Sequence, residues 1–337
     1  MKKSRIVDEN VTEEDIKNHT EEEISVYRPE EVDEDSLSYE EEAYVFIDYI
    51  SLDWPSQTVD CFNSNNVVIG TNPNEGDGKI VSFDLEDFKG SKDGDKLKHN
   101  EKTIPKPLNR IRCKNAIYGV SDDGFYIYNF DLETLHSKDM VEGAGYGLCT
   151  TEDGAYFSSM EGMVYKINDK GLDTFKVHKG SIESLSFGNN LLFSCSTDRS
   201  AKVTDVRSRD VVFDKKYACD INAIDFNQEN IFVFGDDAGL LRVVDLRSLD
   251  TCINIDWHKT SISSVRWKDS DVFISSSDQQ VCIFDLTLEE DWTYEKYLLF
   301  VHQGQKFYKD MCFTSSDSVV TTSIDGLCLF KPISFEE

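Results

Sequence analysis

The chain has 337 residues and a formal net charge of −29, from 64 acidic and 35 basic residues. This balance disfavours nucleic acid and anionic lipid as direct ligands, because both are bound by clustered Lys and Arg, and it favours a basic partner. The nine cysteines form no Cys-x-x-Cys pair, which disfavours a zinc site and a disulfide framework. No apolar run reaches the ~18 residues of a membrane-spanning helix. We therefore expect no cofactor, no metal and no membrane association.

Residues 1–36 are expected to form an acidic, mostly disordered tail, because they contain few apolar groups to offset chain entropy. Residues 1–43 contain 16 acidic and 5 basic residues, and the acids are clustered. A tail that only solvates the protein and a tail that attracts a ligand are both compatible with this composition. The acids predicted to attract a basic partner are Glu21, Glu22, Glu23, Glu30, Glu31, Asp33, Glu34 and Asp35.

Residues 37–50 predict a short N-terminal helix. Ser38 suits the N-cap and three glutamates follow in the first turn, where the helix dipole favours anions. Apolar residues recur from Ala43 at i, i+3, i+4 and i+7, which gives one apolar stripe. We expect this helix to pack on the wall of the next domain, with Tyr44 and Tyr49 either in that packing or in contact with a partner.

Residues 51–335 are organised as seven repeats. An apolar, aromatic or β-branched residue followed by a polar one ends a strand at seven places, 37 to 46 residues apart. This spacing matches the ~40–45-residue period of WD repeats, each of which forms one four-stranded propeller blade. The fold class is therefore predicted to be all-β, a seven-bladed WD-repeat propeller. The pairs are Phe83-Asp84, Tyr128-Asn129, Ile167-Asn168, Thr204-Asp205, Val244-Asp245, Phe284-Asp285 and Phe330-Lys331.

A strand at Ser51–Trp54 is predicted to close the ring by pairing with Leu327–Phe330. The reason is that Asp53-Trp54 resembles Asp256-Trp257, and both pairs precede a turn and a new strand. Closure would remove an open sheet edge that otherwise invites aggregation.

A histidine and an aspartate recur together in three repeats, each with a nearby serine. This resembles a catalytic triad, but a catalytic set would not be repeated three times around a ring. We predict buried structural hydrogen-bond networks instead and no enzyme activity. The pairs are His178 with Asp198, His258 with Asp278, and His302 with Asp325, and the expected hydroxyls belong to Ser194, Ser276 and Ser323.

Segments at both ends of the chain resemble the glutamate-rich WD-repeat proteins. They are Ser25–Pro29, Glu41–Val45, Trp54–Ser56, Leu298–Lys306, Thr322–Gly326 and Phe330–Ser334. The resemblance implies a chaperone of ribosome biogenesis, found in the nucleus, the nucleolus and partly the cytoplasm. It implies binding of a newly made basic ribosomal protein, protein three of the large subunit, and its delivery to pre-ribosomes. This chain departs from the family in its shorter acidic tail and in lacking a long internal acidic insertion.

Three other functions remain open from the sequence. The related histone-binding WD-repeat subunits make a chromatin assembly or modifying complex the main alternative, with histones as the partner. A neutral scaffold would not need this charge, and an enzyme would need a nucleophile–base pair outside the repeats. The segments Glu41–Val45 and Val301–Lys306 favour ribosome assembly over histone binding. We expect a monomer.

Overall fold

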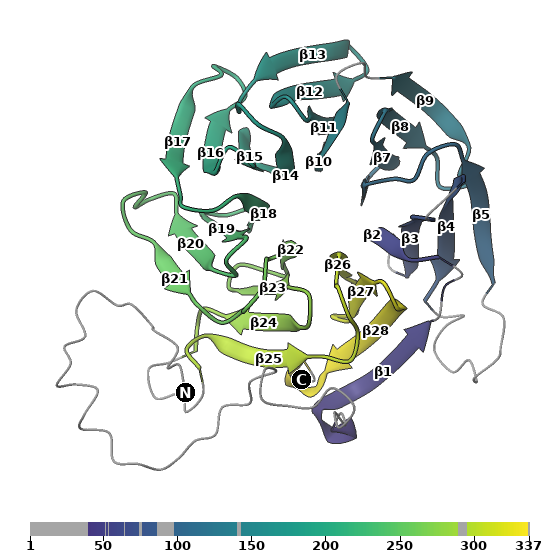
Figure 1. Cartoon of the computed structure of the whole chain (residues 1–337), viewed down its shortest axis with the longest axis vertical. Helices are drawn as coiled ribbons and strands as arrows, with labels where there is room; N and C mark the ends of the chain where they lie inside the picture. The colour runs from purple at the N-terminus through teal and green to yellow at the C-terminus, as the bar shows by residue number, and fades with distance from the viewer. Residues whose placement is uncertain are drawn as a thin grey trace.

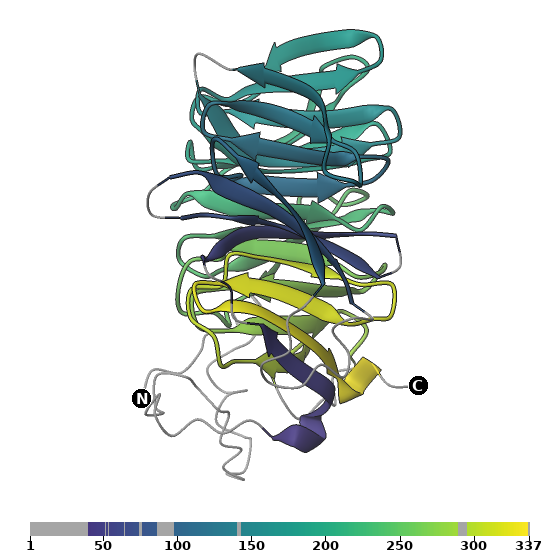
Figure 2. The same cartoon turned by 90° about the vertical axis from the view of Figure 1, so that its right-hand side faces the viewer.

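The structure is a computed structural model that describes residues 40–50, 52, 54–63, 65–73, 76–85, 98–139, 143–288 and 295–335. These residues form seven four-stranded antiparallel sheets arranged as blades around a central axis (Figure 1). Seen edge-on, the ring is a disc much thinner than it is wide (Figure 2). The prediction of an all-β, seven-bladed propeller is confirmed. The predicted acidic tail, residues 1–36, lies outside the described residues.

Six blades are each built from four consecutive strands, which follow one another from the central axis outwards. Blade 1 contains β2 (Ser56–Phe62), β3 (Asn66–Thr71), β4 (Gly78–Asp84) and β5 (His99–Ile104). Blade 2 contains β6 (Arg110–Cys113), β7 (Ile117–Ser121), β8 (Gly124–Tyr128) and β9 (Thr134–Asp139). Blade 3 contains β10 (Ala144–Thr151), β11 (Gly154–Ser159), β12 (Met163–Asn168) and β13 (Gly171–Lys176).

The order from the innermost to the outermost strand is the same in the next three blades. Blade 4 contains β14 (Ile182–Gly188), β15 (Leu191–Ser196), β16 (Ser200–Asp205) and β17 (Val211–Lys216). Blade 5 contains β18 (Ile221–Phe226), β19 (Ile231–Asp236), β20 (Leu241–Asp245) and β21 (Ile253–Ile255). Blade 6 contains β22 (Ser264–Trp267), β23 (Val272–Ser276), β24 (Val281–Asp285) and β25 (Leu298–His302).

Blade 7 joins the two ends of the chain. It contains β26 (Asp310–Phe313), β27 (Val319–Ser323) and β28 (Gly326–Pro332), and its outermost strand is β1 (Tyr44–Ile50). The antiparallel pairing of β1 with β28 places Ile47 opposite Phe330. A 3-10 turn, η5 (Ile333–Phe335), follows β28. Ring closure by the N-terminal part of the chain therefore protects the edge of β28.

The strand that closes the ring begins before the predicted one, and the predicted helix at residues 37–50 is wrong. Of the described residues in this segment, only η4 (Glu41–Ala43) is helical, as a single 3-10 turn, before β1 begins. The sequence of β1, YVFIDYI, is rich in aromatic and β-branched residues that favour strands, and the edge of β28 satisfies its backbone. The helical spacing of its apolar residues was coincidental over so short a segment. Leu52 and Trp54 lie in the connection to β2, outside any strand, and Ser51 and Asp53 lie outside the described residues.

The apolar core fills the spaces between neighbouring blades. The rings of Phe125 and Phe157 stack with centroids 4.1 Å apart between blades 2 and 3, and those of Phe193 and Phe226 stack at 4.3 Å between blades 4 and 5. All four side chains are buried. Each blade therefore needs its neighbours to bury both faces, as expected for a repeat architecture. Among the described residues, no helix is long and apolar enough to cross a membrane.

Candidate functional site

His178 and Asp198 lie together as the sequence predicts. Nδ1 of His178 is 3.2 Å from Asp198 Oδ1, and Nε2 is 2.8 Å from the hydroxyl of Ser194. Burial would raise the pKa of Asp198, but hydrogen bonds from the Lys179 amide and the Ser200 hydroxyl, together with His178, lower it to about 2. Neutral donors and a buried imidazole therefore hold the carboxylate in its charged form, and these contacts fix the turn between β15 and β16 of blade 4.

The pairing predicted between His258 and Asp278 is wrong. Nδ1 of His258 contacts the hydroxyl of Ser277 at 3.0 Å, and Nε2 contacts that of Ser275 at 2.7 Å. Both ring nitrogens are therefore occupied without the carboxylate. The predicted hydroxyl, Ser276, contacts a serine of blade 6 instead, because successive side chains point to opposite sides of the chain and a neighbouring serine faces the ring.

The pairing predicted between His302 and Asp325 is also wrong. Nδ1 of His302 lies 3.1 Å from the hydroxyl of Tyr44, whereas the carboxylate of Asp325 accepts a hydrogen bond from the Lys306 amide at 2.7 Å. The predicted hydroxyl of Ser323 donates to a backbone carbonyl within its own turn. Tyr44 on the closing strand thus takes the place expected of the aspartate.

The two predicted tyrosine sites differ in accessibility. Tyr44 packs edge-on against Phe300 and Phe330, with ring centroids 5.2 and 5.9 Å away, so it belongs to the packing of the closing strand. Tyr49 on the same strand is 49% exposed. Of the two, Tyr49 is the one that a partner can reach. The eight acids predicted in the tail lie outside the described residues.

None of the three histidines is placed to exchange protons near neutral pH. Burial lowers the pKa of His258 and of His302 to about 3. Burial also lowers the pKa of His178, although Asp198 opposes this shift. Within the described ranges, no group of three or more His, Cys, Asp or Glu side chains could hold a metal ion. The recurring histidines are accordingly structural.

One face of the propeller carries a feature that was not predicted from the sequence. In every blade, the turn between the second and third strands from the axis contains a carboxylate. We call these seven residues the carboxylate ring. They are Asp77, Asp122, Glu161, Asp198, Asp237, Asp278 and Asp325. The signal was present in the sequence, since an acid follows the second strand of each repeat, but only the closed ring of blades shows that all seven reach the same face.

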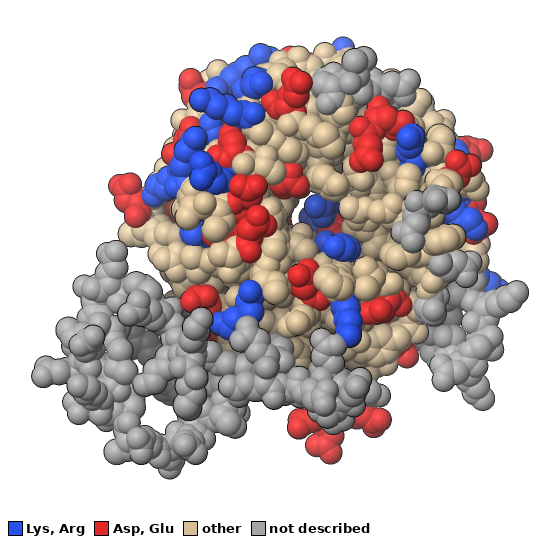
Figure 3. Space-filling model, in the orientation of Figure 1, with Lys and Arg blue, Asp and Glu red and all other residues tan. Residues whose placement is uncertain are grey.

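Neutral donors orient several of these carboxylates. Asp122 accepts a hydrogen bond from the Asn109 amide at 2.8 Å, and Asp237 accepts one from Asn222 at 2.7 Å. Within the described part of the chain, no member of the ring forms an ion pair with Lys or Arg. Because amide donors bring no charge, the negative charge of these two carboxylates remains available to a partner, whereas Asp198 is largely buried against His178. On the face shown in Figure 3, basic side chains lie at the rim of the central opening, acidic side chains lie around it, and further basic side chains gather over β13 and β17.

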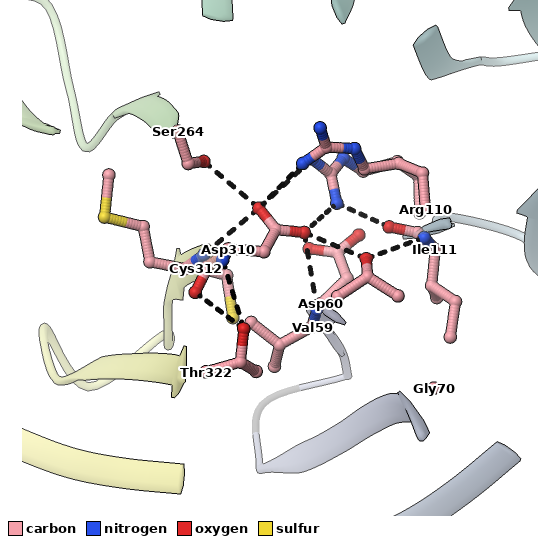
Figure 4. A network of polar contacts seen from close by, with 12 residues as sticks. Val59, Asp60, Gly70, Arg110, Ile111, Ser264, Asp310, Cys312 and Thr322 are labelled. Carbon is pink, nitrogen blue, oxygen red and sulfur yellow. Dashed lines mark hydrogen bonds and ion pairs between the residues drawn. The ribbon is translucent and has the colours of Figure 1, made fainter. Parts of the chain in front are cut away.

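The central channel contains a buried carboxylate that joins four blades (Figure 4). Asp310, at the start of β26, is fully buried and accepts hydrogen bonds from Arg112 Nη1 at 2.8 Å, Thr58 Oγ1 at 2.9 Å and Ser264 Oγ at 3.1 Å. Arg110 lies 3.3 Å away. Burial would raise the pKa of Asp310, but Arg112 and Arg110 hold it well below its usual range. This network was not predicted, because its members are far apart in the sequence.

Comparisons with known proteins give weak matches over parts of the chain. No family model matches. The chain is 38% identical over 61 residues to Protein DSE1 of Scheffersomyces stipitis, which is 18% of this chain and 9% of that protein. It is 25% identical over 124 residues to the WD repeat-containing protein 55 homolog of Drosophila yakuba, which is 35% of this chain and 25% of that protein. Protein HEAT STRESS TOLERANT DWD 1 of Arabidopsis thaliana is 29% identical over 106 residues, 25% of this chain and 23% of that protein.

These matches span at most a quarter of the length of the three relatives. Two of the relatives carry WD repeats or DWD in their names. Together with the seven-bladed propeller, the similarity supports the WD-repeat family.

Proposed function

We propose that this WD-repeat propeller is a non-catalytic assembly factor that binds a newly made, basic ribosomal protein of the large subunit and releases it to pre-ribosomes. The observation that carries the proposal is the carboxylate ring, which places seven acids, with Asp198 largely buried among them, on one face of a chain with a net charge of −29. A ring of carboxylates oriented by neutral donors suits a Lys- and Arg-rich segment, because each carboxylate offers acceptor atoms and uncompensated charge.

The physical role of such a face is to occupy basic segments that would otherwise bind nucleic acid nonspecifically. Exposed charge pairs each contribute roughly 0–1 kcal/mol, so the ring contributes through the number of its charges. The combined field raises the rate of encounter with a basic partner. Release then requires only that ribosomal RNA, which has a higher density of negative charge, competes for the same segment. No chemical step is needed.

The identity of the partner rests on the resemblance of the two chain ends to the glutamate-rich WD-repeat proteins. That resemblance points to protein three of the large subunit and to action in the nucleus, the nucleolus and partly the cytoplasm. Histones are the second candidate partner, because the same face is complementary to any strongly basic protein. We propose that the chain acts as a monomer.

A charge-neutralised ring tests this proposal. We choose the quadruple variant Asp122→Asn, Glu161→Gln, Asp237→Asn and Asp325→Asn, because these side chains are exposed and Asn or Gln can still accept the same hydrogen bonds. The matched control neutralises four exposed acids at the opposite ends of the strands, Asp131→Asn, Glu133→Gln, Glu152→Gln and Asp169→Asn. Both variants change the net charge by the same amount.

Binding of protein three of the large subunit and of histone H3–H4 would be measured by calorimetry, alone and in competition. We expect the ring variant to weaken binding of the ribosomal protein and the control variant to leave it nearly unchanged. Tighter binding of histones by the wild type would replace the ribosomal cargo with the chromatin alternative. Equal effects of the two variants would remove the ring as the binding face.

A further inference from the structure

A cavity of about 490 Å³ opens into the central channel at the end opposite the carboxylate ring. Its lining comes from the last residues of six innermost strands, among them Asp225 of β18 and Arg266 of β22. Antiparallel pairing places the start of each innermost strand beside the turn that carries a ring carboxylate, as for Ser56 opposite Thr71. The ends of the same strands therefore open on the other face of the disc.

Two arginines in the cavity wall have hydrogen-bond donors without a partner among the described residues. Arg112, whose side chain is only 9% exposed, leaves Nε unpaired, and Arg266 leaves both Nε and Nη2 unpaired. Arg112 belongs to blade 2 and Arg266 to blade 6, so the two guanidinium groups approach the channel from different sides. A buried guanidinium N–H without an acceptor raises the free energy of the folded state. Such a group therefore suggests that a bound ligand supplies the acceptor.

The nearby carboxylates already interact with other groups, and Glu152 in the cavity wall pairs with Lys114 at 2.6 Å. Asp310 is shared by Arg110 and Arg112. Asp60 accepts the backbone N–H of Cys113 at 2.7 Å, and Asp225 accepts the N–H of Trp267 at 2.9 Å and a serine hydroxyl at 2.7 Å. These bonds tie neighbouring innermost strands together. Arg266 has no carboxylate at ion-pair distance among the described residues, and the charges of Asp60 and Asp310 act on it only at longer range.

We propose that this cavity binds a small oxyanion, with Arg266 as its main charged contact and Arg112 as a supporting one. A phosphate or carboxylate group supplies the planar or tetrahedral set of acceptor oxygens that a guanidinium fork recognises. The cavity is large enough for either group together with several water molecules, since one water takes up about 30 Å³. This site is independent of the proposed cargo face, because it opens on the opposite side of the disc and requires ligands of the opposite charge.

The test compares the full chain with three variants, each with one arginine replaced. Arg266→Gln removes the unpaired cation but keeps an amide, and it breaks no ion pair seen in the described part of the chain. The matched control Arg247→Gln removes an arginine that is paired with Asp245 on blade 5, far from the channel. Arg266→Lys keeps the positive charge but loses the planar set of guanidinium N–H donors. It therefore distinguishes the contribution of charge to binding from that of hydrogen-bond geometry. Circular dichroism would establish that each variant is folded.

Inorganic phosphate and acetate serve as probes, each titrated at constant pH and ionic strength against chloride. Binding to the native state raises Tm in a saturable way, and titration by ³¹P NMR gives Kd for phosphate. We expect saturable binding in the wild type and in the Arg247→Gln variant, and at least about tenfold weaker binding in Arg266→Gln, corresponding to ~1.4 kcal/mol. The affinity of the Arg266→Lys variant for phosphate should lie between those of the wild type and the Arg266→Gln variant.

Each outcome has a defined consequence. Saturable binding of phosphate alone identifies a free phosphate-type ligand, and saturable binding of acetate as well identifies a site that also accepts the carboxylate of a partner side chain. Phosphate also stabilises proteins nonspecifically by exclusion from their surface, but that effect would be equal in the wild type and Arg266→Gln. An equal response of these two proteins, or no saturable response to either probe, would overturn the proposal.

Discussion

The carboxylate of Asp310 on β26 accepts a hydrogen bond from Arg112 on β6 at 2.8 Å, across the strand β2 that lies between them. This bond connects blade 7 to blade 2 over a sequence separation of 198 residues. Thr58 of β2 bonds to the same carboxylate, so blade 1 is included in the contact. The inner side of the ring is thus joined where the first and last blades meet, while β1 joins its outer side.

Replacing Asp310 is expected to destabilise the fold strongly. Asp310→Ala removes the buried carboxylate that Arg110 and Arg112 share, and removal of one partner from a buried pair costs about 3–5 kcal/mol. Urea unfolding followed by circular dichroism measures this loss. The control is Asp173→Ala, which removes an exposed partner of Arg209 and should cost less than about 1 kcal/mol. Similar losses in both variants would contradict the role given to Asp310.

The two repeated aspartates are expected to differ in their contribution to stability. Asp198→Ala removes the acceptor beside His178 and should cost on the order of 1–3 kcal/mol. Asp278→Ala should cost less, because the ring of His258 is bonded to two serines instead. Calorimetric melting of the two variants checks this difference. A larger loss for Asp278→Ala would mean that the repeated aspartates have another structural role.

Stability is expected to fall as the pH falls from about 6.5 towards 3. In this range the imidazoles of His258 and His302 titrate in the unfolded chain, with a pKa of about 6.5, but stay neutral in the folded one, where burial lowers the pKa to about 3. The unfolded state therefore binds more protons, and stability rises with pH. His258→Gln should flatten the dependence measured by urea unfolding at several pH values. An unchanged slope would contradict the burial of a neutral imidazole at this position.

Deletion of the closing strand is expected to cause aggregation. Removing residues 1–50 eliminates β1 and opens the edge of β28, whose residues Leu327 to Pro332 it covers. Removing residues 1–39 keeps β1 intact and should leave Tm nearly unchanged. Light scattering and thermal melting distinguish the two truncated proteins. If both deletions behave alike, the pairing of β1 with β28 does not contribute to stability.

The propeller could be predicted from the sequence because each blade is a local unit that repeats. The spacing of pairs such as Val244-Asp245 and Phe284-Asp285 is a property of neighbouring residues, and it recurs along the chain. The closing strand could not be assigned correctly, since YVFIDYI fits a short amphipathic helix as well as a strand. Its conformation is decided by the edge of β28, which lies almost the whole chain away.

In the candidate sites too, contacts between residues close in the sequence could be predicted, and contacts between distant residues could not. The pairing of His178 with Asp198 spans 20 residues and was predicted, whereas the contact of His302 with Tyr44 spans 258 residues and was not. The channel network around Asp310 depends on residues from four blades, and a single charged residue in a strand gives no sign of its partner. The carboxylate ring could not be predicted, because the sequence alone does not show which turns between strands lie on the same face of the propeller.

The acidic tail and the carboxylate ring are expected to act on different rate constants. Replacing Glu21, Glu22, Glu23, Glu30, Glu31, Asp33, Glu34 and Asp35 with Gln or Asn should slow association with protein three of the large subunit and flatten its salt dependence. The expected change is in the association rate, because long-range attraction between charges acts mainly on encounter and is screened over about 8 Å at physiological salt.

Neutralising the ring should act differently, because its carboxylates are oriented by hydrogen bonds such as that from Asn222 to Asp237. Contacts to fixed groups are retained in the complex, so the ring variant should also raise the dissociation rate. Stopped-flow association and displacement experiments at several salt concentrations measure both rates for the two variants. A tail variant that dissociates faster, combined with a ring variant that does not, would move the binding site from the propeller face to the tail.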